Sequence, residues 1–129
     1  MADDRRHARS GSPFEESIGF SRAVRVGDRV IVSGTAPIWP DGSCPDDAGV
    51  QAARCFEIAL AALAELGGEP ADVVRTRMYL TDPALAGVVG DAHRQAVGVA
   101  APAATMLVVA ALLDPRWKVE IEAEANIDA

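Results

Sequence analysis

The chain has 129 residues, half of them hydrophobic, and a formal net charge of −7. This length suits one compact domain, and so much apolar sequence argues against intrinsic disorder. The acidic excess opposes contact with a phosphate backbone, which depends on clustered Lys and Arg. We therefore expect no nucleic-acid partner.

No signal peptide is recognisable at the N-terminus. The first seven residues are charged and no apolar signal-peptide core follows them. The apolar run over residues 97–113 is broken by Gly and Pro, so no membrane span is expected. Cys44 and Cys55 fall in a predicted loop and a predicted helix, without further Cys or His at metal-ligand spacing. We expect a cytoplasmic protein without membrane contact, metal or cofactor.

Residues 1–16 are polar and predict a flexible N-terminal arm, which leaves residues 17–129 as a single domain. Over residues 25–32, the turn-forming pair Gly27 and Asp28 separates a short strand from a stronger β-branched one. Ser33 and Gly34 end the second strand, and a loop rich in Pro, Gly and Asp follows.

A helix is predicted over residues 47–66, because apolar residues recur there at spacings of three and four. Asp46 and Asp47 suit the positive N-terminal end of a helix, and Gly67 and Gly68 suit its C-terminal end. The small residues in the stripe indicate close packing on a sheet. The stripe comprises Ala52, Cys55, Phe56, Ala59, Ala62, Leu63 and Leu66.

Residues 73–80 alternate as a strand does, with Val74, Thr76, Met78 and Leu80 on one face and Arg75, Arg77 and Tyr79 on the other. A weaker helix over residues 83–97 contains two glycines, each costing about 1 kcal/mol relative to alanine. Its predicted inward residues are Leu85, Val88, Val89, Ala92 and Ala96. Residues 105–112 and 117–125 are the last predicted strands.

The last strand separates charge from apolar surface. Its three glutamates share one face, and Ile121, Ala123 and Ala125 share the other. Two helices cover only one face of such a small sheet, so the charged residues of both strands share the second face. That face is either hydrated or buried against other subunits with its charges paired. We predict the second arrangement, a barrel between subunits.

Four segments carry a family resemblance, at residues 24–34, 72–82, 101–110 and 119–123. Their order and spacing resemble the RidA (YjgF/YER057c) family over about residues 18–126. The resemblance implies an α+β fold similar to that of the small trimeric chorismate mutases. It would have a mixed sheet of about six strands, two helices on one face and a trimeric barrel on the other.

The resemblance also implies a function. Family members are homotrimers that hydrolyse reactive imines and enamines, and small metabolites, expected to be anionic, bind in clefts between their subunits. Glu120 corresponds to the glutamate proposed to position the attacking water, and Ser33 and Gly34 correspond to residues that line the cleft. Deaminating members read Pro-Ala-Arg-Ser, in which the arginine grips the substrate carboxylate. Here Ala104 stands at the arginine position and Thr105 follows it.

Loss of this charge-assisted contact removes about 1.5–3 kcal/mol of binding free energy for the substrate carboxylate. Imine deamination is therefore not expected by the family's usual route. Arg77 either replaces the missing arginine or only pairs with glutamates inside the barrel. Glu120 is either a general base in a dry cleft or one more barrel carboxylate. His93 either exchanges protons with a ligand or is an ordinary helix histidine. Thr105 either offers its hydroxyl to a ligand or has no such role.

Three functions therefore stay open. The first is a hydrolase of small imines or enamines that uses Glu120, with Arg77 or backbone amides holding an anionic group. The second is a trimeric ligand-binding module without turnover. The third is a helper or tailoring protein of a specialised biosynthetic pathway.

Overall fold

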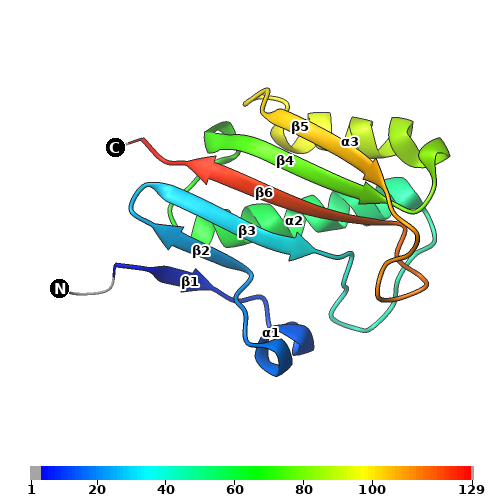
Figure 1. The fold of residues 1–129 in the computed structure, drawn as a ribbon, viewed down its shortest axis with the longest axis horizontal. Helices are drawn as coiled ribbons and strands as arrows, with labels where there is room; N and C mark the ends of the chain where they lie inside the picture. Colours follow the sequence, from blue (N-terminus) through cyan, green and yellow to red (C-terminus); the bar gives the residue numbers. More distant parts are fainter. Residues whose placement is uncertain (1–3, 129) are drawn as a thin grey trace.

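The computed structural model describes residues 4–128, and Figure 1 shows a twisted sheet that runs the length of the molecule. The predicted succession of strands and helices is confirmed, and two short elements precede it. Two 3₁₀ turns, η1 (Pro70–Asp72) and η2 (Pro83–Leu85), lead into β4 and α3. The remaining elements are β1 (Arg6–Ala8), α1 (Pro13–Ile18), β2 (Ala23–Val26), β3 (Arg29–Thr35), α2 (Ala48–Glu65), β4 (Val73–Leu80), α3 (Ala86–Val97), β5 (Ala103–Val108) and β6 (Val119–Asn126).

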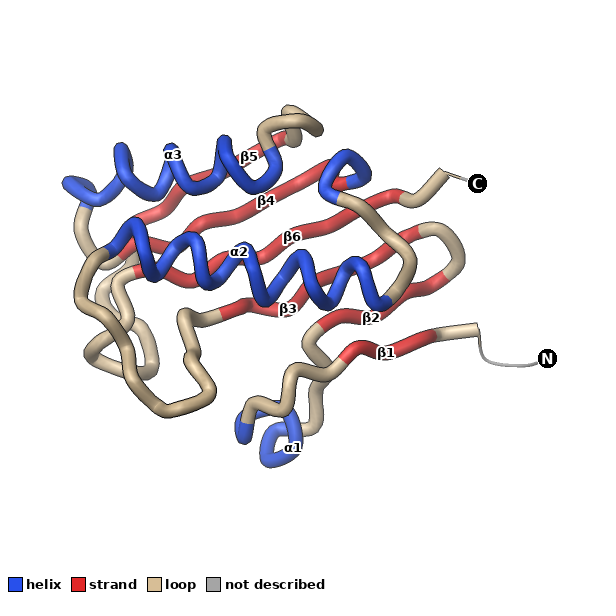
Figure 2. Tube along the Cα trace, turned by 180° about the vertical axis from the view of Figure 1, so that it is seen from behind, coloured by secondary structure: helices blue, strands red, loops and turns tan. Residues whose placement is uncertain are grey.

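The sheet has the strand order β1-β2-β3-β6-β4-β5. The last strand of the chain, β6, lies between β3 and β4 and runs antiparallel to both. β5 runs parallel to β4, and α3 makes the crossover between them. Figure 2 shows α2 and α3 side by side in front of the sheet, both covering the same face. The predicted α+β fold with a mixed six-stranded sheet is confirmed.

The core lies between α2 and the sheet. All seven residues of the predicted stripe in α2 are buried. They pack with the inward side chains of the strands, among them Val32, Met78 and Ile121. At its N-terminus, α2 is capped by the Asp47 carboxylate, which accepts a hydrogen bond of 3.0 Å from the Val50 amide. The helix stripe therefore decides which face of the sheet is covered.

Two predicted core residues are instead exposed. Val74 is 50% exposed, because a register shift between Val73 and Arg75 in the pairing of β4 with β6 buries Val73 in its place. Val88 is 46% exposed. The buried stripe of α3 is narrower than its sequence pattern indicates, since only Val89 and Val97 are fully buried in this helix.

The segment predicted as a flexible arm belongs to the fold over its described part. Residues 6–8 form β1, which pairs antiparallel with β2, and Ala8 is completely buried. α1 follows, with Pro13 in its first turn and the Ser12 hydroxyl accepting a 3.3 Å hydrogen bond from the Phe14 amide. Burial and capping together order this segment. Residues 1–3 of the predicted arm lie outside the described residues.

Within residues 4–128, no helix combines the length and hydropathy needed to cross a bilayer.

Candidate functional site

The face of the sheet away from the helices carries the charged residues of β4 and β6, as predicted. Glu124 forms an ion pair of 3.3 Å with Arg29 of β3, and the Tyr79 hydroxyl donates to Glu122. Arg77 forms no ion pair with a carboxylate of residues 4–128. In the register of the two strands, Arg75 lies opposite Glu124, Arg77 lies opposite Glu122 and Tyr79 lies opposite Glu120.

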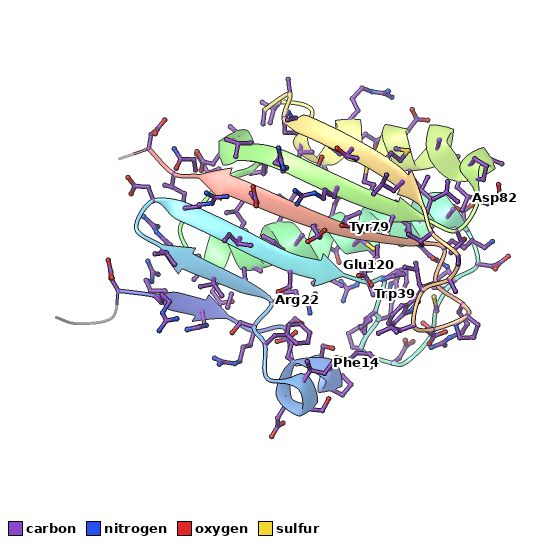
Figure 3. The ribbon with its side chains drawn as sticks, in the orientation of Figure 1. Phe14, Arg22, Trp39, Tyr79, Asp82 and Glu120 are labelled. Atoms are coloured by element: carbon purple, nitrogen blue, oxygen red, sulfur yellow. The ribbon has the colours of Figure 1, made fainter. Side chains whose placement is uncertain are left out.

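Glu120 differs from the other two glutamates because it lines a cavity at the end of the sheet. Figure 3 shows Glu120, Arg22 and Phe14 at this end, contributed by β6, by the residue just before β2 and by α1. The cavity has a volume of about 130 Å³, and Glu120 and Arg22 are its two ionisable lining residues. Its other lining residues are Ser12, Phe14, Ile18, Phe20, Gly34, Ala36, Ile38, Leu113 and Trp117.

Gly34 allows the Glu120 carboxylate to lie directly against the strand backbone. A Cβ atom at Gly34 would stand 2.6 Å from Oε2 of Glu120, so any side chain there would displace the carboxylate. The register between β3 and β6 shifts between Val32 and Thr35, around this point. The glycine at the end of β3 thus has a definite role in placing Glu120.

Arg22 is a residue of this cavity that the sequence reasoning missed. Its side chain is 6% exposed and forms a 3.3 Å ion pair with Glu15, which is 4% exposed. Its Nη1 donates to the Gly34 carbonyl and to Thr35 Oγ1. Glu15 in turn accepts hydrogen bonds from the Ser10 amide, at 3.0 Å, and from the Ser10 hydroxyl. The ion pair therefore ties α1 to the strand end that carries Gly34.

The carboxyl groups of the buried Glu15 and the half-buried Glu120 have opposite pKa shifts. Burial raises the pKa of Glu120; the charge of Arg22 opposes this effect, and Glu122 adds to it. Burial alone would also raise the pKa of Glu15, but the hydrogen bonds from Ser10 and the charge of Arg22 outweigh it. The pKa of Glu15 consequently lies below its ordinary value. Glu120 is thus the carboxyl suited to exchange protons, and Glu15 is the structural partner of Arg22.

Four of the other predicted site residues lie away from this cavity. The Ser33 hydroxyl donates to the Ser21 carbonyl at 2.7 Å and ties β3 to the segment before β2. In the register of β4 and β5, Thr105 lies opposite Arg77 and Ala104 lies opposite Thr76. Thr76 is completely buried on the side of the sheet that the helices cover. One whole strand, β4, separates β5 from the strand of Glu120. Of the predicted set, only Glu120 and Gly34 line this cavity within one chain.

His93 lies on the opposite side of the sheet from Glu120. Its Nε2 atom is 2.7 Å from Thr76 Oγ1. Its ring meets Phe56 edge-on, with centroids 5.6 Å apart. Burial lowers the pKa of His93, which favours the neutral ring. These contacts describe a histidine that joins α3 to the sheet and to α2.

The described part of the chain contains no group of three or more His, Cys, Asp or Glu residues placed to hold a metal ion. Burial raises the pKa of both thiols, Cys44 and Cys55, and so disfavours the thiolate form at each.

The chain resembles known proteins over nearly its whole length. The family model described as endoribonuclease L-PSP matches residues 12–127. The protein SCO2049 of Streptomyces coelicolor is 41% identical over 121 residues, which cover 93% of this chain and 90% of the relative.

Solved structures agree with this match. Rv2704 of Mycobacterium tuberculosis, described as a member of the YjgF/YER057c/UK114 family, is 41% identical, with a TM-score of 0.88 over 96% of this chain and 100% of that one. TM0215 of Thermotoga maritima is 27% identical, with a TM-score of 0.81 over 100% of this chain and 96% of that one. The chain therefore belongs to the RidA family, also called YjgF/YER057c/UK114.

Proposed function

We propose that this protein binds a small imine- or enamine-type metabolite in the Glu120 cavity and hydrolyses it. The observation that carries the proposal is a single carboxyl group, with its pKa raised by burial, set in an otherwise largely apolar cavity against Gly34. Imine hydrolysis adds water across the C=N bond and releases a carbonyl compound and an amine. Glu120 would take a proton from the attacking water and return it to the departing nitrogen. A carboxyl with a raised pKa suits both steps.

We also propose that the protein acts as a homotrimer, the assembly implied by the family resemblance. The support is the uncovered face of the sheet, where the 46% exposed Ile31 pairs with Glu124 and lies among charged residues. A face that mixes apolar and charged side chains suits burial against another copy of the chain. The cytoplasmic location stays a prediction from the sequence.

Sedimentation equilibrium tests the assembly, and the expected mass is that of three chains. Ile31→Glu should dissociate the trimer, because it buries a further carboxylate beside Glu124. Val50→Glu is the matched control, since Val50 is also 46% exposed but lies on α2, behind the sheet. A monomeric wild-type protein would contradict the proposed barrel.

We do not extend the description endoribonuclease from the family to this chain. RNA binding rests largely on cations that contact phosphates, whereas this chain has a net charge of −7. Three glutamates also lie on the face of β6 that the helices leave open. The Glu120 cavity supports hydrolysis of a small molecule. The charge of the chain and the glutamates of β6 give no such support for RNA cleavage.

The test of the proposed activity is hydrolysis of freshly generated imines, measured as release of ammonia. Both 2-iminopropanoate and an uncharged aldimine without a substituent on nitrogen should be offered, and at least one should be consumed faster than it decays spontaneously. Glu120→Gln should lower turnover by about a hundredfold or more, the usual contribution of a general acid–base. Glu124→Gln, on the same face of β6 but outside the cavity, should retain activity. Equal rates for wild type and Glu120→Gln would rule the mechanism out.

A binding module without turnover is the second candidate. The observation that favours it is Ala104, which offers no cation at the position of the family's substrate-binding arginine. Binding at the cavity without acceleration of either imine would establish this second function. A role as a helper protein in a biosynthetic pathway would then follow from the ligand that binds.

A further inference from the structure

We infer that Arg22 is a positioning residue for Glu120, because it fixes the end of β3 against which the Glu120 carboxylate lies and places a positive charge beside that carboxylate. This role deepens the proposed function and rests on it, since Glu120 is the group assigned to proton transfer. Three observations carry it, namely the irregular end of β3, the bonds of Arg22 to that end, and the charges that face Glu120.

The end of β3 needs support because its pairing with β6 is irregular there. Between Val32 and Thr35, β3 advances by three residues where β6 advances by two. Two residues of β3 thus oppose one of β6, which is the pattern of a β-bulge. Gly34 lies in this stretch, and the Glu120 carboxylate lies directly against it. The position of the bulge therefore decides where the carboxylate can rest.

Arg22 binds this bulge from the segment before β2. Its Nη1 atom donates to the Gly34 carbonyl and, at 3.1 Å, to Thr35 Oγ1. The Thr35 hydroxyl in turn donates to the Ser33 carbonyl at 2.7 Å. One guanidinium thus holds the backbone on which the Glu120 carboxylate lies.

The guanidinium is itself fixed on two further sides. Its Nε atom lies 3.3 Å from Oε2 of Glu15, and both side chains are buried. Its central carbon lies 5.3 Å from the centroid of the Phe20 ring. Glu15 is fixed in turn by the amide and the hydroxyl of Ser10. A planar fork with fixed partners suits the support of a functional group by its neighbours.

Arg22 is also the cation that faces Glu120, since both residues line the same cavity. The other ionisable groups beside Glu120 are Glu122 on its own strand, Tyr79 opposite it on β4, and Cys55 of α2. The hydrogen bond to Glu122 raises the pKa of Tyr79, and burial raises the pKa of Cys55, so both stay neutral. Burial raises the pKa of Glu120, Arg22 opposes this effect, and Glu122 adds to it. Arg22 thus limits how far burial weakens the acidity of Glu120.

A neighbouring subunit of the proposed trimer would add its own groups to the Glu120 cavity. These groups are the same in the wild type and in a variant of Arg22, so their effects cancel when the two proteins are compared. The role of Arg22 is a difference between proteins and does not depend on the complete lining of the cavity.

The first test removes the charge of Arg22 and spares the fold. The double substitution Glu15→Leu with Arg22→Met replaces the ion pair by apolar side chains, which is often neutral for stability. The side-chain carboxyl ¹³C signal of Glu120, assigned with Glu120→Gln, reports its titration. The pKa of Glu120 should be higher in the double variant, because burial remains and the opposing charge is gone. Asp91→Asn with Arg94→Gln is the matched control, since it removes an exposed ion pair of α3 and should leave this titration unchanged.

Arg22→Lys separates position from charge. Lysine keeps a positive charge beside Glu15, but its ammonium group lacks the planar fork that binds Glu15 and Gly34 at once. Turnover should fall about ten- to hundredfold with little change in KM, since a small displacement of a reacting group has an effect of this size. The change in the Gly34 amide signal on titration of Glu120 should also become smaller, because the carboxylate moves away from Gly34.

Either substitution can overturn the inference. An unchanged pKa of Glu120 in the double variant would refute the role of the charge, and a merely structural ion pair would give this result. Wild-type turnover and an unchanged Gly34 signal in Arg22→Lys would refute the positioning role. If the double variant does not fold, Arg22→Lys still decides. If the wild type hydrolyses neither imine, the proposed function fails, and the two NMR titrations still decide the role of Arg22.

Discussion

Glu15→Ala is expected to lower the free energy of unfolding by about 3–5 kcal/mol, the cost of leaving one partner of a buried ion pair uncompensated. The side chains of Arg22 and Glu15 are only 6% and 4% exposed, so water cannot replace the missing carboxylate. The substitution also removes the acceptor for both hydrogen bonds from Ser10. Urea denaturation of the wild type and the variant measures the difference.

The neighbouring substitution Glu16→Ala is the matched control and should change stability by less than about 0.5 kcal/mol, because Glu16 is exposed. The double substitution Glu15→Leu with Arg22→Met should recover much of the lost stability, since apolar replacement of a buried ion pair is often neutral. A loss below 1 kcal/mol in Glu15→Ala would mean that Arg22 finds another way to satisfy its charge.

The loss in Glu15→Ala should also depend on pH in a defined direction. Hydrogen bonds from Ser10 and the charge of Arg22 hold the pKa of Glu15 below its ordinary value of 4.5, despite the opposing effect of burial. The ion pair therefore stabilises the fold fully above pH 4.5, and its contribution disappears as the pH falls through the lower folded-state pKa. The difference in stability between wild type and variant should therefore become smaller in acid.

Glu120→Gln is expected to have effects of opposite sign on activity and stability. Turnover should fall by about a hundredfold or more, because an amide cannot transfer the proton. Stability at neutral pH should rise, seen as a higher melting temperature, because the carboxylate is held in a site whose burial raises its pKa. Such a trade-off is common where a functional group sits in an unfavourable environment.

The pH dependence identifies the cause of this stability gain. The folded-state pKa of Glu120 lies above its ordinary value of 4.5, so the stability of the wild type should fall as the pH rises from 4.5 through the folded-state pKa. Glu120→Gln should lack this fall, and the two proteins should approach each other in stability near pH 4. Glu124→Gln serves as the control on the same strand. A Glu120→Gln variant less stable than the wild type at pH 7 would mean that the carboxylate makes favourable contacts instead.

The sequence by itself determined the family and most of the architecture. The stripe of α2 and the alternation of β6 are local patterns, and each is confirmed residue by residue. Their repeat distances of 3.6 and 2 residues belong to single elements, so no knowledge of neighbouring strands is required. The same locality explains the error at Val74, where a shift in the pairing of β4 with β6 reverses the face that alternation predicts.

Only the tertiary structure decided which chemical groups meet. β6 inserts between β3 and β4, and this placement brings Glu120 against Gly34 and near Arg22. It leaves His93 on the other face and Ala104 beyond β4. The sequence does not indicate that Glu15 and Arg22 form a buried ion pair. An arginine next to a polar segment has the sequence pattern of an exposed residue, and only the folded structure shows the buried carboxylate beside it. Strand order and burial arise from contacts between distant parts of the chain, and these contacts determine the charge of the cavity.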